Sequence, residues 1–244
     1  MIIESLNNSK VKAWNKLKEK KFRDEENLFL IEGDHLVECA LNCGVVKEIV
    51  TSHENFKMPN IPIYYVTDSI MKKLSNQVTS TDILAVCQKL PEREIKGNVC
   101  LLDNIQDPGN LGTIIRSAKA FGIDSLILSL DTVDLYNDKV IRASEGLLFG
   151  LNIIKADLKE TIKKLKEKNY TIYGTNCKEG PELRKTSFAP LSAIIIGNEG
   201  RGMKEELTSM CDEMLHISID GESLNAGVAA SIIFYEVKNG KRKN

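Results

Sequence analysis

The sequence predicts an α/β protein in which a small α/β domain precedes a larger domain built on a mainly parallel sheet. Short apolar runs alternate along the chain with amphipathic helix patterns, and strands that are apolar throughout are typical of a parallel sheet covered on both faces. A polar segment over residues 91–98, with a proline and a glycine, interrupts the alternation and is typical of a linker. We therefore expect one domain over residues 1–91 and a second over residues 97–244.

The first domain is predicted from helix and strand patterns that alternate. A charged helix near the N-terminus carries Val11, Trp14 and Leu17 along one side. A second helix begins at Asp34, a good N-cap, and ends at Gly44, a good C-cap. In chain order we expect a helix over 9–21, a strand over 29–33, a helix over 34–44, strands over 46–52 and 61–67, a helix over 68–76 and a strand over 82–90.

The second domain repeats the alternation with more continuous apolar strands. Its first helix is expected to begin at the cap residue Asn110 and to bury Leu111, Ile114 and Ile115, while Arg116 points off that face. In chain order we expect a strand over 98–105, a helix over 110–122, a strand over 124–129, a helix over 138–149, a strand over 151–156, a helix over 157–169, strands over 170–176 and 192–200, a helix over 204–212, a strand over 214–219 and a helix over 223–240.

The composition excludes several classes of protein. Hydrophobic residues make up 42% and charged residues 27% of the chain, which excludes disorder as its main state. No apolar run approaches the roughly 20 residues of a membrane span, and the N-terminus does not resemble a secretory signal. We therefore expect a cytoplasmic protein with no membrane partner. The six cysteines form no C-x-x-C pair and no zinc-ligand set, so we expect reduced thiols and no bound metal.

The formal net charge of −1 excludes a polycation, yet basic residues gather near the N-terminus. Between residues 10 and 23 the acidic side chain of Glu19 stands alone. Such a basic segment predicts contact with a polyanion such as RNA. The alternative is that these residues form the solvated face of a helix. Its basic residues are Lys10, Lys12, Lys16, Lys18, Lys20, Lys21 and Arg23.

Three segments that follow predicted strands are rich in glycine, asparagine and small polar residues. In a parallel sheet, ligands bind at loops that leave the carboxyl ends of the strands. Neither G-x-G-x-x-G before a helix nor G-K-[ST] occurs, which disfavours dinucleotide and P-loop sites. Each polar residue of these segments also has a purely structural alternative. Asn110, Ser223 and Asn225 are typical helix caps. Arg116 could be a solvated surface charge, and Glu199 could lie in an exposed turn. The segments are DPGNLGTIIRSA (107–118), IIIGNEGRGM (194–203) and ISIDGESLNAGVAASIIFYE (217–236).

In order and content, these three segments resemble the motifs of the SpoU/TrmH family of RNA ribose 2′-O-methyltransferases, which belong to the SPOUT class. The stretch FLIEGDHLVECALNCG, followed by a strand and then ILAV, looks like the small substrate-binding domain that many members carry. The resemblance implies a C-terminal α/β domain with a deep trefoil knot and an active site formed across a homodimer. It implies S-adenosylmethionine as cofactor and RNA as substrate, with rRNA favoured over tRNA by the two-domain layout.

The resemblance also assigns roles to individual residues. Asn137, Arg142 and Ser144 fall in a segment that looks like a further family motif. Ser218 stands where the family often has proline, and the loop before Ser223 is shorter than in many relatives. The residues implied as catalytic are Asn110, Arg116, Glu199, Ser223 and Asn225; as cofactor contacts, Gly197, Asn198, Ile217 and Leu224; as RNA contacts, Lys10, Lys12, Lys20, Lys21, Arg23 and Arg142.

The implied reaction is an in-line displacement at a sulfonium methyl, for which orientation supplies most of the acceleration. The hydroxyl must lose a proton, and the family assigns the base to the arginine that matches Arg116. A guanidinium ordinarily stays protonated, so two roles stay open for Arg116: local deprotonation, or a clamp on an RNA phosphate. The alternatives are a tRNA ribose methyltransferase, an RNA-binding module with a vestigial site, and an α/β enzyme that uses another nucleotide.

Overall fold

The structure is a computed structural model that describes residues 2–77, 81–176, 180–221 and 223–240. The chain forms two compact units. One comprises residues 1–91 together with 134–149, and the other comprises 92–133 and 150–244. The segment 134–149 thus belongs structurally with the N-terminal part of the chain, although in sequence it lies within the predicted second domain.

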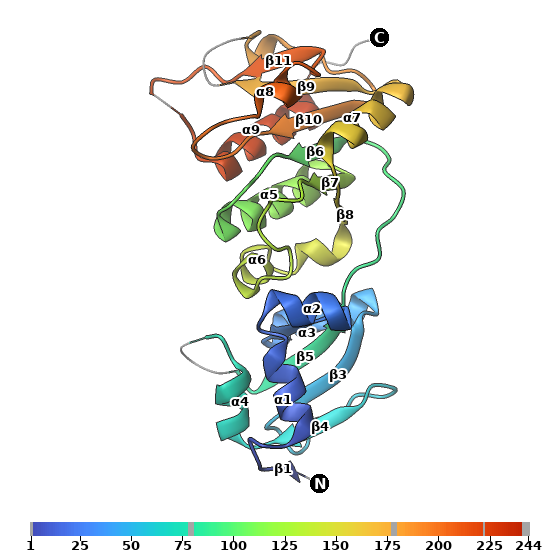
Figure 1. Ribbon diagram of the computed structural model, residues 1–244, viewed down its shortest axis with the longest axis vertical. Helices are drawn as coiled ribbons and strands as arrows, with labels where there is room; N and C mark the ends of the chain where they lie inside the picture. Colours follow the sequence, from blue (N-terminus) through green and yellow to red (C-terminus); the bar gives the residue numbers. More distant parts are fainter. Residues whose placement is uncertain (1, 78–80, 177–179, 222, 241–244) are drawn as a thin grey trace. The chain divides into compact units, whose positions relative to one another are not determined.

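The N-terminal unit is a mixed sheet with helices packed on it (Figure 1). The sheet order is β1-β4-β3-β5-β2, in which β5 runs antiparallel to both neighbours. A core of buried side chains joins α1 and α4 to the sheet through residues such as Trp14, Ile70 and Leu84. The elements are β1 (Ile2–Ile3), α1 (Ser9–Lys16), α2 (Lys20–Glu26), β2 (Leu28–Glu32), α3 (Asp34–Cys43), β3 (Val46–Thr51), β4 (Ile63–Val66), α4 (Asp68–Leu74), β5 (Ile83–Gln88) and α6 (Asp138–Ala143).

The single helix predicted over 9–21 is wrong, because the chain breaks between α1 and α2. Glu19 has an extended backbone, and the carbonyls of Leu17 and Lys18 are left without helical partners. The guanidinium of Arg23 donates to both carbonyls, at 2.8 and 2.7 Å. The break is therefore stabilised by a side chain further along the chain, which a local periodicity does not reveal.

The C-terminal unit is built on a six-stranded sheet of order β11-β9-β10-β6-β7-β8, in which every neighbouring pair is parallel (Figure 1). This confirms the predicted fold class. The elements are β6 (Val99–Leu102), α5 (Pro108–Phe121), β7 (Ser125–Leu128), β8 (Asn152–Lys155), α7 (Leu158–Glu167), β9 (Thr171–Asn176), β10 (Ser192–Ile196), α8 (Glu205–Thr208), β11 (Glu213–His216) and α9 (Ala226–Asn239), with a short 3₁₀ turn at Leu183–Lys185. A second 3₁₀ turn, Leu147–Gly150, lies where the chain passes from the segment 134–149 to this unit.

Both faces of this sheet are buried, as the continuous apolar strands predict. Alternate residues such as Leu101 and Ile195 pack with Ile162 of α7 and Leu207 of α8. The intervening residues, for example Leu102 and Ile194, are equally buried. The helix predicted over 138–149 ends instead at Ala143, because Glu145 and Gly146 both adopt positive φ, which a helix does not tolerate.

No helix in the described parts of the chain is long and apolar enough to cross a bilayer. The cysteines at 39, 43, 87, 100 and 211 are free thiols; Cys177 lies outside the described residues. Among residues 2–77, 81–176, 180–221 and 223–240, no three His, Cys, Asp or Glu side chains gather as a metal site would require.

Candidate active site

Two segments that leave neighbouring strands form the centre of the candidate site. β6 and β10 pair in parallel, with Leu102 opposite Ile196, so the segments that follow them leave the sheet side by side. The segment after β6 leads into α5. The segment after β10 is a glycine-rich loop, residues 197–203, that leads into α8. This is the end of a parallel sheet at which ligands are expected.

Glu199, in the glycine-rich loop, holds the start of α5. Its carboxylate accepts hydrogen bonds from the backbone N–H of Asp107 at 3.1 Å and from the side-chain amide of Asn110 at 3.0 Å. The backbone N–H of Gln106 also donates to it, at 3.3 Å. Burial by itself raises the pKa of Glu199, but the hydrogen bonds outweigh it and hold the pKa below its ordinary value. Glu199 is therefore a stable anion, better suited to position its neighbours than to accept a proton.

Asn110 lies inside the first turn of α5, so the prediction that it caps this helix is wrong. Pro108 takes the first helical position, for which its fixed φ suits it. Asp107 is the cap and accepts the backbone N–H of Asn110 at 2.8 Å. The nearly buried Asn110 side chain is then free to connect two other segments. It donates to Glu199, and its oxygen accepts the side-chain amide of Asn225 at 2.7 Å.

Asn225 caps α9, as predicted. Its oxygen accepts the backbone N–H groups of Gly227 and Val228 at 2.9 and 3.2 Å, while its nitrogen donates to Asn110. Ser223 does not take the cap position, because Asn225 occupies it. Glu199, Asn110 and Asn225 therefore form one hydrogen-bonded chain that joins all three segments singled out in the sequence.

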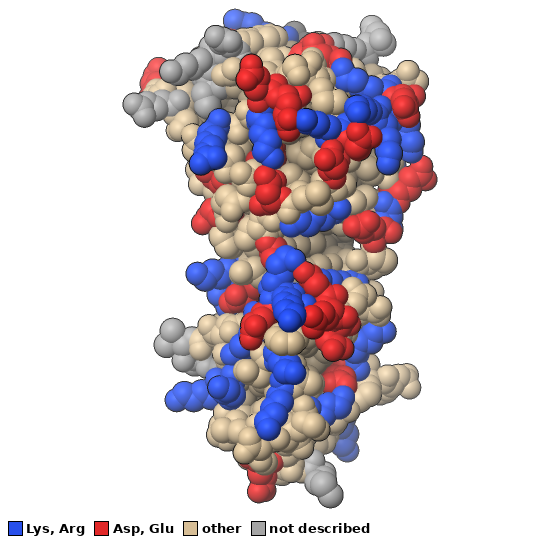
Figure 2. Space-filling view, viewed as in Figure 1, with Lys and Arg blue, Asp and Glu red and all other residues tan. Residues whose placement is uncertain are grey.

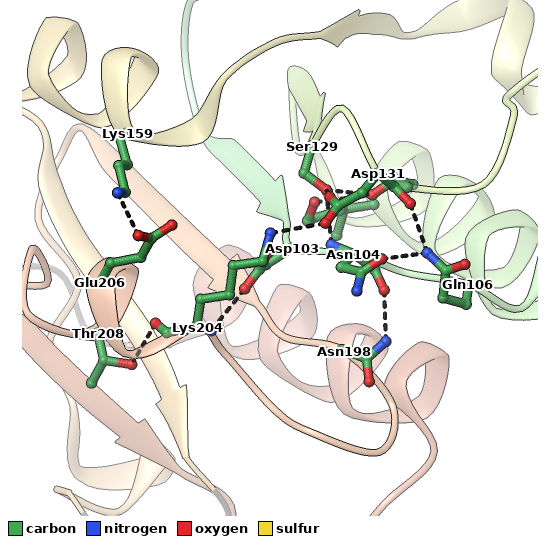
Figure 3. Close-up of polar contacts among 12 residues, drawn as sticks. Asp103, Asn104, Gln106, Ser129, Asp131, Lys159, Asn198, Lys204, Glu206 and Thr208 are labelled. Carbon is green, nitrogen blue, oxygen red and sulfur yellow. Dashed lines mark hydrogen bonds and ion pairs between the residues drawn. The ribbon is translucent and has the colours of Figure 1, made fainter.

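The glycine-rich loop is closed on itself by backbone contacts. Asn198 and Gly202 exchange backbone hydrogen bonds of 2.9 and 3.0 Å, and the Asn198 side chain donates to the carbonyl of Asn104 at 2.7 Å (Figure 3). A Cβ on Gly197 would lie 2.4 Å from the backbone of Gly202, and Gly202 itself has a φ of +70°. Glycine is thus required at both ends of the closed loop.

A cavity of about 590 Å³ opens beside the glycine-rich loop. The four residues predicted to contact a cofactor, Gly197, Asn198, Ile217 and Leu224, all line it, as do Glu199 and Ser223. Met203, the last residue of the segment 194–203, lines it as well, and so do Thr175 and Met214, which the sequence did not single out. Thr175 and Met214 reach the cavity because β9 lies between β10 and β11, an order that is not evident from the sequence.

Arg116 stands apart from this cluster. It is exposed on α5, about 9 Å along the helix axis from Asn110 at 1.5 Å per residue. It does not line the cavity, and no hydrogen bond or ion pair joins it to another residue of the described ranges. The structure therefore gathers Asn110, Glu199, Ser223 and Asn225 around one site and leaves Arg116 on the surface.

The residues of the further motif lie in the N-terminal unit and have structural contacts there. Asn137 caps α6 by accepting the backbone N–H of Lys139 at 2.9 Å, and Ser144 is buried and donates to Ile141. Arg142 lies 2.9 Å from a carboxylate oxygen of Asp138 and 3.7 Å from one of Glu32. These contacts give Asn137 and Ser144 structural roles. Arg142, whose side chain is 34% exposed, stays a predicted RNA contact.

The predicted RNA contacts differ in how available they are. Lys12 is exposed, and so is Lys21, whose ammonium lies 3.9 Å from Glu25. Lys10 and Lys20 form ion pairs with Glu48 and Asp24. Arg23 is only 6% exposed, and besides its two carbonyl contacts it donates to Asp134 at 2.6 and 3.1 Å. All of these contacts of the guanidinium are within the fold, so Arg23 has a structural role and is not part of an RNA-binding surface.

Comparison with known proteins places this site in a family. Residues 97–235 match the SpoU rRNA methylase family, and residues 8–85 match the MRM3-like substrate binding domain. The 23S rRNA (guanosine(2553)-2′-O)-methyltransferase RlmP of Bacillus subtilis is 38% identical over 97% of this chain and 98% of its own length.

Two solved structures share this fold over nearly the whole chain. The rRNA methyltransferase of Sinorhizobium meliloti is 26% identical, with a TM-score of 0.90 over 98% of this chain and 97% of that one. The AdoMet-bound form of the Sinorhizobium meliloti enzyme is 25% identical, with a TM-score of 0.88 over the same shares.

These matches define the chain as an RNA methyltransferase, the enzyme class that the resemblance of the three motifs implies. The chain belongs to the SpoU rRNA methylase family. The family confirms S-adenosylmethionine as the methyl donor. The cavity suits such a molecule, because its volume lies within the range of about 300–1,000 Å³ that is usual for small-molecule sites.

Proposed function

We propose that this protein transfers the methyl group of S-adenosylmethionine to the 2′-hydroxyl of a guanosine in 23S-type rRNA, in the cytoplasm. The observation that carries the proposal is the hydrogen-bonded chain of Glu199, Asn110 and Asn225 beside the cavity. The substrate follows the relative from Bacillus subtilis, which is similar over nearly the whole chain.

S-adenosylmethionine, when bound, supplies an activated methyl group on a sulfonium. The backbone of the glycine-rich loop, with Ile217 and Leu224, would hold it, because these groups line the cavity. Glu199 and Asn110 fix that loop against α5, and Asn225 fixes the start of α9. Ser223, at the cavity and exposed, is placed to hydrogen-bond a ribose. The contribution of the chain is thus mainly the alignment of two reactants.

We propose that the active site is completed by a second copy of this chain. Arg116 lies outside the cavity of its own chain, so a homodimer would allow it to reach the cavity of the partner. Val228, Ile232 and Tyr235 of α9 are 45%, 36% and 52% exposed, and their spacing puts them on one side of the helix. The small residues of α9 also allow close packing within the chain, since the hydroxyl of Ser231 lies 2.6 Å from that of Ser117 in α5.

Charged substitutions on this apolar stripe are expected to separate the dimer. We expect the double variant Ile232→Asp, Tyr235→Lys to run as a monomer and to lose methyl transfer at least about 100-fold, because Arg116 then has no partner site. Light scattering after size exclusion measures the mass. The control is Leu191→Asp. Leu191 is an apolar residue that directly precedes β10 and is 37% exposed, and this variant should stay dimeric and active. A fully active monomer would contradict the shared site.

We also propose that the N-terminal unit contacts the RNA through α1 and α2. Lys12, Lys20 and Lys21 are exposed there, and Figure 2 shows basic side chains, with acidic ones among them, over the face on which these helices lie. The match of residues 8–85 to a substrate binding domain supports this role. The division into residues 1–91 and 97–244 remains the functional division that we propose, with the first part for RNA and the second for transfer.

The choice of RNA is tested by transfer of labelled methyl groups to unmodified rRNA and tRNA in parallel. We expect label in 23S-type rRNA and none above background in tRNA. Label in tRNA alone would replace the rRNA proposal with the tRNA alternative. Binding of S-adenosylmethionine with no transfer to any RNA, including ribosome-assembly intermediates, would favour an RNA-binding module.

A further inference from the structure

A buried carboxylate lies directly behind the glycine-rich loop. Asp103 follows the last residue of β6, and its backbone N–H donates to Ile196 of β10 at 2.9 Å. The residue is 1% exposed. A carboxylate that is this deeply buried needs a compensating partner, because its transfer from water is costly.

Lys204 is that partner, and it is the residue that follows the glycine-rich loop. Its backbone N–H donates to one oxygen of Asp103 at 2.8 Å, and its ammonium lies 3.3 Å from the other oxygen. That second oxygen accepts no hydrogen bond from the described residues, so the ammonium balances its charge. Lys204 also reaches Asp131 at 2.9 Å, and Asp131 accepts the hydroxyl of Ser129 at 2.6 Å (Figure 3).

These contacts fix the far end of the glycine-rich loop. Its near end continues β10 and is fixed by the pairing of Ile196 with Leu102. Residues 197–203 all line the cavity, so the two fixed ends determine the shape of one wall. Neither Asp103 nor Lys204 lines the cavity. The side chain of Asp103 acts on the cavity wall through the backbone of Lys204, which directly follows the loop.

We propose that Asp103 and Lys204 are positioning residues for methyl transfer, which hold the glycine-rich loop in the conformation that binds S-adenosylmethionine. The proposal rests on the proposed function for the identity of the ligand. Neither residue touches the reacting atoms. Their effect is to prearrange the backbone groups of the loop, so that binding need not order them.

The test is the affinity of the full-length protein for S-adenosylmethionine, measured by calorimetry without RNA. We expect Lys204→Met to weaken binding about tenfold and Asp103→Asn to weaken it at least as much, since a small misplacement of a binding group has effects of this order. Lys204→Arg keeps the charge and should restore the affinity to within about threefold of the unchanged protein.

Glu206→Gln is the matched control. Glu206 lies in α8, two residues after Lys204, and the change removes its exposed ion pair with Lys159 of α7; neither of these two side chains lines the cavity. The kinetics add a second measurement that lost stability alone would not change. In Lys204→Met, KM for S-adenosylmethionine should rise while KM for RNA stays the same and kcat falls less than about threefold.

Wild-type affinity in both Asp103→Asn and Lys204→Met would overturn this proposal and leave the proposed function standing. An equal loss in Glu206→Gln would also overturn it, because any change in α8 would then have the same effect. A wild-type protein that does not bind S-adenosylmethionine would overturn both proposals.

Discussion

Replacing Arg116 with alanine is expected to lower kcat for methyl transfer by about 10²- to 10⁴-fold, the range for the loss of a group that acts in proton transfer or transition-state stabilisation. Arg116 is exposed and makes no hydrogen bond or ion pair within the described residues, so the variant should fold normally. We expect its Tm to stay within about 2 °C of the wild type. Binding of S-adenosylmethionine should be unchanged, because Arg116 does not line the cavity of its own chain.

Arg116→Lys separates the two roles that stay open for this residue. If Arg116 accepts the proton, the pH–rate profile of the lysine variant should shift to lower pH, because lysine loses its proton at a pH about two or more units below arginine. If it clamps a phosphate, lysine should restore part of the rate with no shift of the profile.

The matched control for both Arg116 variants is Lys119→Ala. It removes a cation from the same helix, where Lys119 donates to the carbonyl of Gly150. Full activity in Arg116→Ala would show that Arg116 is not needed for methyl transfer. A loss of equal size in Lys119→Ala would show that the reaction needs the positive charge of this helix and not Arg116 in particular.

Replacing Glu199 with glutamine is expected to lower methyl transfer by about 10- to 100-fold. Glu199 accepts every one of its hydrogen bonds, and a side-chain amide would place an N–H group against donors such as Gln106 and Asn198. Hydrogen bonds to a charged group contribute about 1.5–3 kcal/mol each in general, and 1.4 kcal/mol corresponds to a factor of ten in rate. Affinity for S-adenosylmethionine should fall with the rate, because Glu199 lines the cavity.

The pH dependence of the wild type provides a second test of Glu199. Its pKa in the folded protein lies below the ordinary value of 4.5, so the stabilisation by the carboxylate is complete above that value and is lost as the pH falls through the lowered pKa. We therefore expect that protonation of Glu199 does not lower the affinity for S-adenosylmethionine between pH 7 and about pH 5. A loss of binding near neutral pH that disappears in Glu199→Gln would show that Glu199 takes up a proton there, and would contradict its role as a stable anion.

Much of the fold is predictable from local patterns. The parallel sheet follows from strands such as 99–102 and 192–196, which are apolar at every position because both faces are covered. The three site segments were found because each follows a strand and carries small polar residues, and the structure does bring Asn110, Glu199 and Asn225 together.

The features that local patterns missed depend on contacts between distant residues. The break after α1 is stabilised by Arg23, whose charge suggested an RNA contact, whereas its burial shows a structural role. The start of α5 was misplaced because Asp107 is the cap and Pro108 takes the first helical position, ahead of Asn110. Asp103 gave no signal, since it falls inside the strand predicted over 98–105 and its partner Lys204 lies about a hundred residues further along the chain.

The position of the transferred methyl group shows whether this site methylates the ribose of rRNA. Unmodified 23S-type rRNA would be incubated with S-adenosylmethionine and the wild-type protein, digested to nucleosides and examined by mass spectrometry. We expect 2′-O-methylguanosine to be formed by the wild type and to be absent with Arg116→Ala. A methyl group on a base, or 2′-O-methylguanosine formed equally by the variant, would contradict it.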